Sequence, residues 1–230
     1  MISLLARVID LLAPRECAIC GRRLAVSEEV MCGACNFHLP RTGFSANAFD
    51  NSMTRLFWKI IPIERAAALF FYEAQSQSSN VIYKLKYGHR PDIAEDMGRI
   101  AAAEFARDGF FDGIDAIVPV PLAKNRRRER GYNQSVEIAK GMSAVAGIPV
   151  LAEVASRDTF VKSQTTMDRW QRQANVASVF HLRDGSLIAG KHVLIVDDIV
   201  TSGATIASLA AELMYAGNVK FSVASLGFTH

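Results

Sequence analysis

Two adjacent acids followed by small, hydroxyl-bearing residues are the part of this sequence best suited to bind a phosphorylated ligand. Asp197 and Asp198 follow the apolar run 193–196, which suits a buried parallel strand. The next residues are Thr201, Ser202, Gly203, Ala204 and Thr205. A helical pattern begins at 206, so the segment predicts a strand, an acid pair, a short loop and a helix. Ligands of open parallel sheets bind beyond the carboxyl ends of the strands.

This order of elements predicts a phosphate site. The first amides of a helix are unpaired and carry partial positive charge, which favours an anion. Gly203 allows a close backbone approach, and the hydroxyls of Thr201, Ser202 and Thr205 can donate hydrogen bonds. The two carboxylates would repel a phosphate, so we expect them to face sugar hydroxyls or a metal ion. The alternative is an ordinary strand with an acidic helix cap, which explains one Asp but not two followed by this loop.

A second group of chemically active residues is the set of four cysteines, Cys17, Cys20, Cys32 and Cys35. Two C-x-x-C turns separated by a short insert match a zinc site with four thiolate ligands, of the ribbon or knuckle type. Zinc with four thiolates has no open position, so the site is predicted to be structural. The alternatives are an iron–sulfur cluster, which the spacing does not exclude, and two disulfides.

A third group is a cluster of basic residues, Lys124, Arg126, Arg127, Arg128 and Arg130. It is predicted to lie in a loop after a short strand at 115–121. Arginines hold phosphate oxygens through two-pronged hydrogen bonds, so this loop is a candidate anion site. Lys84 and Lys86, on a predicted helix at 78–87, are further candidates. The net charge of +3 does not by itself imply a nucleic-acid partner.

Strands and helices must alternate to position these residues. We predict strands at 65–72, 115–121, 150–155, 177–182, 192–196 and 219–226, and helices at 53–59, 78–87, 92–105, 133–146 and 206–215. Asp92 is the expected cap of the third helix. Alternation of this kind predicts an α/β fold with a mainly parallel central sheet flanked by helices. The polar stretch 157–174 is predicted to be a functional flap.

The chain is expected to have four parts. These are an amphipathic helix at 1–14, a four-cysteine module at 15–40, a connector at 41–64 and the α/β domain at 65–230. The first helix is expected to pack on its own domain, or alternatively on a partner or membrane. No secretory signal or segment long enough to span a bilayer is expected, so the predicted location is the cytoplasm.

The acidic segment resembles the signature with which type I phosphoribosyltransferases bind phosphoribosyl pyrophosphate (PRPP). More narrowly, the chain resembles the ComF (competence protein F) family, which is related to the amidophosphoribosyltransferase domain. The matching pieces are the cysteine module, 84–87, 119–122, 128–134, 157–159, 162–164, 172–175 with Phe180, and 193–205. The resemblance implies a type I phosphoribosyltransferase fold with an N-terminal zinc-ribbon-like module, and structural zinc.

The resemblance also implies roles for the site residues. Asp197 and Asp198 would meet the ribose hydroxyls and help place Mg²⁺, and the loop 201–205 would hold the 5-phosphate. The pyrophosphate end would meet the second anion group, composed of Arg126, Arg128, Arg130, Lys84 and Lys86. Phosphoribosyl transfer to an unidentified acceptor is the implied reaction. We do not expect ammonia to be drawn from glutamine, because no cysteine is free to serve a glutaminase.

Members of the ComF family are linked to the uptake of single-stranded DNA in natural transformation, so the resemblance implies that pathway. The alternative to an enzyme is a PRPP or nucleotide sensor, or a scaffold, that holds single-stranded DNA and a helicase partner. In that case the cluster 126–130 would track DNA phosphates and Tyr132 would stack on a base.

Overall fold

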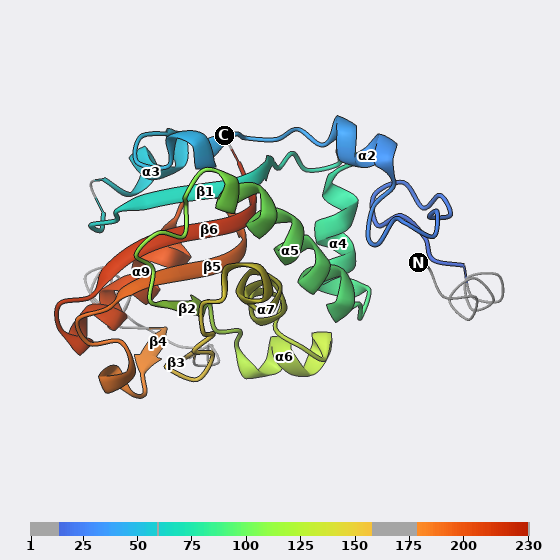
Figure 1. The fold of residues 1–230 in the computed structure, drawn as a ribbon. Helices are drawn as coiled ribbons and strands as arrows, with labels where there is room; N and C mark the ends of the chain where they lie inside the picture. The colour runs from blue at the N-terminus through green and yellow to red at the C-terminus, as the bar shows by residue number, and fades with distance from the viewer. Residues whose placement is uncertain (1–13, 59, 158–178, 230) are drawn as a thin grey trace, which may run out of the picture.

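A four-stranded, fully parallel sheet forms the centre of the protein (Figure 1). The structure is a computed structural model that describes residues 14–58, 60–157 and 179–229 of the 230. The strand order of the central sheet is β1-β6-β5-β2. The strands are β1 (Arg65–Phe71), β6 (Lys220–Phe228), β5 (His192–Val200) and β2 (Ala116–Pro119). These strands are almost continuously apolar because both faces of the sheet are covered.

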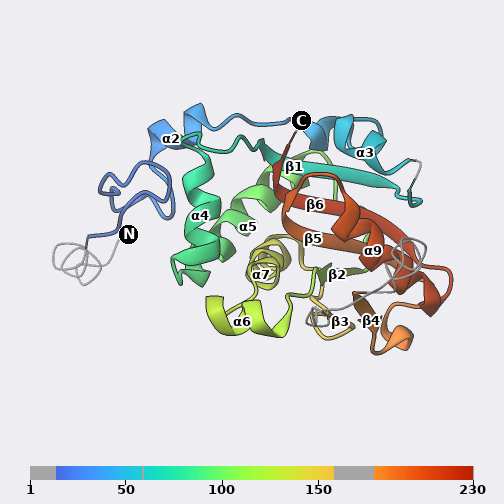
Figure 2. The same cartoon turned by 180° about the vertical axis from the view of Figure 1, so that it is seen from behind.

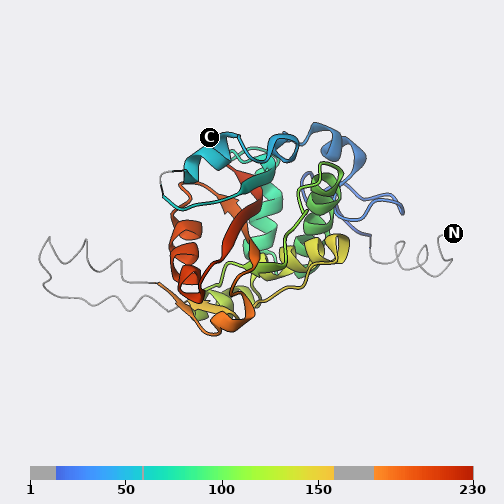
Figure 3. The same ribbon diagram turned by 60° about the vertical axis from the view of Figure 1, so that its left-hand side comes forward.

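Helices cover both faces of this sheet (Figures 2 and 3). One face carries α4 (Ser79–Tyr87), α5 (Pro91–Arg107) and α7 (Gln134–Ala146). The other face carries α9 (Ala204–Leu213) and the short α3 (Ser52–Phe57). Alternate residues of each strand enter the two resulting cores: Leu194 and Val196 face one, and Val193 and Ile195 face the other. The predicted α/β class with a mainly parallel sheet flanked by helices is confirmed.

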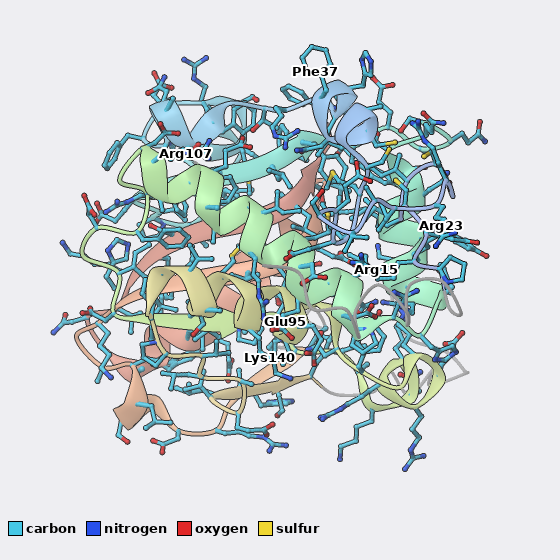
Figure 4. The ribbon with its side chains drawn as sticks, turned by 45° about the vertical axis from the view of Figure 1, so that its right-hand side comes forward. Arg15, Arg23, Phe37, Glu95, Arg107 and Lys140 are labelled. Atoms are coloured by element: carbon cyan, nitrogen blue, oxygen red, sulfur yellow. The ribbon has the colours of Figure 1, made fainter. Side chains whose placement is uncertain are left out.

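Helices α5 and α7 pack backbone against backbone. A Cβ atom on Gly141 would lie 1.9 Å from the carbonyl oxygen of Glu95, and one on Gly98 would lie 2.2 Å from that of Ile138. The labels of Glu95 and Lys140 in Figure 4 mark this crossing. Because only glycine permits such an approach, these two positions set the distance between the helices. They therefore also fix where the first residues of α7 lie relative to the sheet.

The remaining described elements are short. They are α2 (Gly33–His38), α6 (Lys124–Arg130), the strands β3 (Ala155–Arg157) and β4 (Phe180–Leu182), and three 3₁₀ turns at Phe44–Asn47, Gly185–Leu187 and Met214–Ala216. Strands β3 and β4 pair with each other in a separate antiparallel sheet. The predicted edge strand at 177–182 therefore supplies β4 to this separate sheet and does not join the central sheet. Of the predicted strand at 150–155, only Ala155 lies in β3, and Val150 forms an isolated parallel bridge to Ile117 of β2.

Three local predictions are wrong. The basic segment at 124–130 is the helix α6 and not a loop, because Lys, Arg and Glu are good helix formers and Gly131 ends the helix at φ +80°. Strand β5 continues through the acid pair to Val200, so the acids lie within the strand. Asp92 does not cap α5: Arg90 occupies the cap, Pro91 the first position, and Asp92 pairs with Arg90 at 2.6 Å.

The predicted helix at 1–14 and the predicted flap at 157–174 fall, apart from Pro14 and Arg157, outside the described residues. Among the described residues, no helix combines the length and apolar character needed to cross a bilayer.

Candidate functional site

The two acids of β5 are held by two different helices. Asp197 Oδ1 accepts a hydrogen bond of 3.0 Å from Ser135 Oγ, at the start of α7, and one of 2.9 Å from the backbone N–H of Asp198. Asp198 Oδ2 lies 3.3 Å from Lys86 Nζ, near the end of α4. The acid pair therefore lies where two helices of one face meet the carboxyl end of the sheet, which is where open parallel sheets bind their ligands.

Asp197 resists losing its proton. Burial raises its pKa to about 7, and the neighbouring Asp198 carboxylate adds to the effect. The hydrogen bonds from the backbone of Asp198 and from Ser135, together with the charge of Lys86, act in the opposite direction but do not cancel it. Two adjacent carboxylates in one partly buried place favour a ligand that brings hydroxyl groups or a cation.

The loop between β5 and α9 enters its helix through a glycine. Gly203 caps α9 at φ +72°, and a Cβ atom there would lie 2.7 Å from Phe57 Cε1. Glycine is thus required both by the left-handed backbone and by the packing of α3 beneath the loop. Thr201 and Thr205 line the same cavity as the acids, and 202–204 line a small hollow of about 30 Å³ beside Asp197.

The two acids and the loop residues Thr201 and Thr205 line one cavity of about 370 Å³. Arginines complete it: Arg126 and Arg130 come from α6, and Arg157 comes from the end of β3. Arg130 is 8% exposed, and its guanidinium lies 5.6 Å from the ring centre of Tyr87. Desolvation lowers the pKa of Arg157, while the charge of Asp197 raises it. The cavity thus places carboxylates, hydroxyls and guanidinium groups around one space.

Two of the predicted anion-site residues do not reach this cavity. Lys84 Nζ donates a hydrogen bond of 3.3 Å to the carbonyl oxygen of Cys17 and borders a different hollow, next to Cys20. Arg128 is exposed and does not line the cavity. Lys86, Arg126 and Arg130 are the members of that group that do line it. Lys84 and Lys86 project from α4 in different directions. Lys84 therefore contacts the cysteine module, whereas Lys86 contacts Asp198.

Among the cavity residues that the predicted site lacked, three bear on its chemistry: Gln134, Ser135 and Arg157. Gln134 is 2% exposed, and its Nε2 atom has no hydrogen-bond partner among the described residues. A buried donor without a partner is costly, so a ligand acceptor in the cavity would satisfy it. The motifs at 128–134 and 157–159 contained two of these residues, but sequence alone did not say that they meet Asp197.

The four cysteine sulfurs form a compact cluster. All four Sγ atoms lie within 4.8 Å of one another, and those of Cys20 and Cys32 are 3.8 Å apart. A tetrahedral Zn²⁺ with Zn–S bonds of about 2.3 Å requires sulfur separations of about 3.8 Å, so the residues fit the metal. The backbone N–H of Cys32 also donates to Cys17 Sγ at 3.4 Å.

The surroundings of the cluster shift the pKa values of its thiols in different directions. The backbone N–H of Arg22 lowers the pKa of Cys20 to about 6, and Arg22 Nη2 lies 3.6 Å from Cys32 Sγ. Burial raises the pKa of Cys35. A metal ion would satisfy all four sulfurs together and hold them as thiolates.

The cysteine module contacts the rest of the protein through α4. Asn80 Nδ2 donates to the carbonyl oxygen of Ile19 at 2.9 Å, and Lys84 contacts Cys17 as described above. Cys17, Ile19 and Leu24 are buried in the same core as the inward face of α4. Figure 4 shows Arg15 and Arg23 on this module, on the side away from Arg107. The module is therefore packed against the domain that carries the acid pair.

This fold and cavity define a phosphoribosyltransferase-type domain. The family described as "Phosphoribosyl transferase domain" matches residues 91–226, and the chain belongs to this family. The match contains α7, β5, the loop 201–205 and the acid pair. The predicted type I phosphoribosyltransferase fold is therefore confirmed, together with an N-terminal four-cysteine cluster that fits a zinc module.

The protein is similar to members of the ComF family over most of its length. It is 28% identical over 217 residues to DNA utilization protein YhgH of Escherichia coli (strain K12), a match that covers 90% of this chain and 94% of that protein. It is 30% identical over 104 residues to Competence protein F of Haemophilus influenzae, covering 45% of each chain. The resemblance to the ComF family is confirmed by these relatives, whose names refer to DNA utilization and competence.

Solved structures with some likeness to the chain include an amidotransferase and a phosphoribosyltransferase. The glutamine PRPP amidotransferase of B. subtilis is 20% identical, with a TM-score of 0.42 over 61% of this chain and 30% of that chain. An adenine phosphoribosyltransferase of Saccharomyces cerevisiae is 17% identical, with a TM-score of 0.35 over 61% of this chain and 72% of that chain.

Proposed function

We propose that the cavity binds PRPP and that the protein is a PRPP-dependent phosphoribosyltransferase acting on an unidentified acceptor. The observation that carries this proposal is that Asp197 and Asp198 line one cavity of about 370 Å³ together with two loop hydroxyls and three arginines. The hydroxyls belong to Thr201 and Thr205. PRPP has a monophosphate at one end, a diol in the middle and a pyrophosphate at the other end. The cavity has chemically matching groups for all three parts of PRPP: hydroxyls, carboxylates and guanidinium groups.

In this assignment the hydroxyls of Thr201 and Thr205 and the first amides of α9 hold the 5-phosphate. The carboxylates of Asp197 and Asp198 accept hydrogen bonds from the ribose hydroxyls. Arg126, Arg130 and Arg157 face the pyrophosphate. The unpartnered Gln134 Nε2 donates to an oxygen of the ligand.

Transfer would proceed by breaking the bond between the ribose C1 and the pyrophosphate oxygen while the acceptor forms a new bond to C1. The arginines stabilise the charge of the departing pyrophosphate. Asp197 and Asp198 are also the residues that would hold Mg²⁺, which neutralises charge on a departing pyrophosphate. Lys86 must release or share Asp198 when the metal and ligand bind, because its ammonium lies 3.3 Å from that carboxylate.

Zn²⁺ is proposed as the metal of the four-cysteine cluster, with a structural role. Four thiol groups without disulfides suit the reducing cytoplasm, which is the proposed location. The relatives named for DNA utilization and competence support a role in DNA uptake during natural transformation. A helicase-type partner is proposed on the resemblance to the ComF family alone.

The test is titration calorimetry of the full chain with PRPP in the presence of Mg²⁺. The Asp197→Asn/Asp198→Asn variant is expected to lose binding by at least about tenfold while keeping its circular dichroism spectrum. Asp112→Asn is the control, because Asp112 is an exposed acid before β2, at the opposite end of the strands. Unchanged affinity in the double variant would rule out the site.

A pyrophosphate-release assay separates the enzyme from the alternative, a PRPP sensor or scaffold. Release that depends on an added nucleobase or amine acceptor is expected for a transferase. Tight PRPP binding without release, across a panel of acceptors, would identify the sensor instead.

A further inference from the structure

A second cavity adjoins the one that contains the acid pair, and the two share a wall. We call it the side pocket; it has a volume of about 330 Å³ and is lined by residues of α6, α7 and β3 and by the segments beside them. Small-molecule sites have volumes of about 300–1,000 Å³, so the side pocket can admit a small ligand. Its lining is strongly charged, with five cations and two carboxylates.

Helix α6 separates the two cavities and contributes cations to both. Lys124 and Arg127 line the side pocket, whereas Arg126 and Arg130 line the cavity with the acid pair. Helical residues three or four positions apart share a face, so these two pairs lie on different faces of α6. Figures 1 and 2 both show α6 and β3 beyond β2, the edge strand of the central sheet. The side pocket is therefore a neighbour of the proposed PRPP cavity and not a part of it.

The wall of the side pocket between α6 and α7 is held by hydrogen bonds. Tyr132 donates one of 2.6 Å to the carbonyl oxygen of Leu85, which ties this wall to α4. Asn133 Nδ2 donates one of 3.0 Å to the carbonyl oxygen of Val120, and Asn133 Oδ1 accepts one of 3.1 Å from the backbone N–H of Ser135. A wall fixed in this way needs little ordering when a ligand binds, which favours binding.

The two carboxylates of the side pocket are already paired with cations. Glu137 Oε2 lies 2.9 Å from Lys140 Nζ, and Glu153 Oε2 lies 3.6 Å from Arg183 Nη1. Each of these pairs joins one positive and one negative charge, so together they add no net charge. The charge of the side pocket is therefore set by its other cations.

Three cations of the side pocket are left: Lys124, Arg127 and Arg157. None of them has an ion pair within residues 14–58, 60–157 and 179–229. Unpaired positive charge around one space attracts an anion. Guanidinium groups hold phosphate oxygens through two-pronged hydrogen bonds, so a phosphate with several negative charges is the chemical class that fits best.

Arg157 lines both cavities. Its guanidinium lies 5.1 Å from the ring centre of Phe180, its partner residue in the pairing of β3 with β4. Burial lowers the pKa of Arg157, the charge of Asp197 raises it, and the charge of Arg126 lowers it. Groups of the PRPP cavity therefore act on this guanidinium, which has too few donors to serve an anion on each side fully.

The side pocket is poorly placed for the acceptor of phosphoribosyl transfer. The shared wall includes Arg157, which we assign to the pyrophosphate end of PRPP. An acceptor that displaces a leaving group in line approaches the sugar carbon from the opposite face. An anion in the side pocket would therefore lie on the side of the departing pyrophosphate.

We infer that the side pocket binds a small phosphate anion with several negative charges, such as pyrophosphate, and that this anion opposes PRPP binding in the adjoining cavity. Two effects act in the same direction. The anion draws on Arg157, which is then less available to PRPP, and the two anions repel each other across the shared wall. The anion site does not depend on the proposed function, whereas its effect on PRPP rests on it.

The first experiment is calorimetric titration of the full chain with inorganic pyrophosphate, without PRPP. Lys124→Ala/Arg127→Ala is expected to weaken one site about tenfold or more, because charge-assisted hydrogen bonds to the anion are lost. Arg126→Ala is expected to leave that site unchanged, because Arg126 lines only the other cavity. The inference is overturned if the unaltered protein has no site with this dependence on the two groups of variants.

Arg128→Ala is the matched control. Arg128 is an exposed arginine of the same helix that lines neither cavity, and alanine preserves the helix. This variant is expected to bind pyrophosphate like the unaltered protein. An equal loss in Arg128→Ala would show a general effect of the charge on α6, and the side pocket would then not be the site.

PRPP calorimetry at rising pyrophosphate concentrations tests the coupling. PRPP affinity is expected to fall more steeply in the unaltered protein than in Lys124→Ala/Arg127→Ala, in which only direct competition for the PRPP cavity remains. Without pyrophosphate the two proteins are expected to bind PRPP within about twofold of each other, since neither replaced residue lines that cavity. Equal falls would refute the coupling. Absence of PRPP binding would refute the proposed function, and the pyrophosphate titration would still decide the anion site.

Discussion

Lys86 Nζ lies 3.3 Å from Asp198 Oδ2, so an ammonium group already neutralises one of the two acids at the rim of the sheet. The two side chains are 26% and 13% exposed, and this partial burial makes the pair stronger than one on an open surface. The contact joins α4 to β5 and places a cation beside the cavity. Lys84, two residues earlier on the same helix, contacts the cysteine module instead.

We therefore predict that Lys86→Met lowers PRPP affinity by about tenfold, because the acid pair loses its counter-charge and the ligand loses a cation. Lys84→Met is the matched control from the same helix and is expected to leave PRPP affinity unchanged. Calorimetry measures both. An equal loss in the two variants would show that the helix, and not the position of one ammonium, is responsible.

Ser135→Ala is predicted to weaken PRPP binding by about three- to tenfold, since it removes the hydroxyl that orients Asp197 at a cost of about 1 kcal/mol. Ser143→Ala, near the other end of α7, is the control. If Ser135→Ala binds PRPP as tightly as the unaltered protein, the hydrogen bond does not position the acid.

The contribution of Asp197 to the stability of the ligand-free protein is predicted to fall as the pH rises from about 4 to about 7. The pKa of Asp197 is raised in the folded state to about 7 from an ordinary value of 3.8, so the folded protein binds this proton more tightly than the unfolded chain. The stability that comes from this bound proton is present at low pH and is lost as the pH rises through the pKa of Asp197 in the folded state. Asp197→Asn should remove this fall, so the variant should gain free energy of unfolding relative to the unaltered protein between about pH 4 and pH 7. Urea unfolding of both proteins at several pH values would measure the difference.

One zinc ion per chain is predicted by elemental analysis of the purified protein, and Cys32→Ser is expected to reduce it to near zero. The melting temperature should fall as well, because a module of this size draws much of its folding free energy from the metal. Ser27→Ala, an exposed change in the same module, should keep both the metal and the melting temperature. Iron with visible absorbance in the unaltered protein would contradict the assignment.

Gly141→Ala is predicted to destabilise the fold by about 1–3 kcal/mol or more, because the added Cβ would sit 1.9 Å from the carbonyl oxygen of Glu95. Ala144→Gly, an exposed change on the same helix, is expected to cost about 1 kcal/mol through helix propensity alone. Chemical denaturation compares the two. A neutral or stabilising effect of Gly141→Ala would show that α5 and α7 can move apart.

Sequence alone was enough to identify the features that lie close together along the chain. Asp197, Asp198 and the loop 201–205 are contiguous, and the cysteines form two short turns, so residue type and spacing carry the information. The sheet was predictable for a similar reason, because strands buried on both faces are continuously apolar. Helix α6 was missed because its pattern has charge but no apolar period, which left only propensity to indicate a helix.

Tertiary structure decided which distant residues share the cavity. Lys84 and Lys86 have the same chemistry, but two helical residues differ by about 200° around the axis, so one meets Cys17 and the other meets Asp198. Ser135 reaches Asp197 across 62 residues only because Gly98 and Gly141 set how closely α7 and α5 pack. Side-chain direction and helix spacing depend on packing between elements, and no local pattern in the sequence records them.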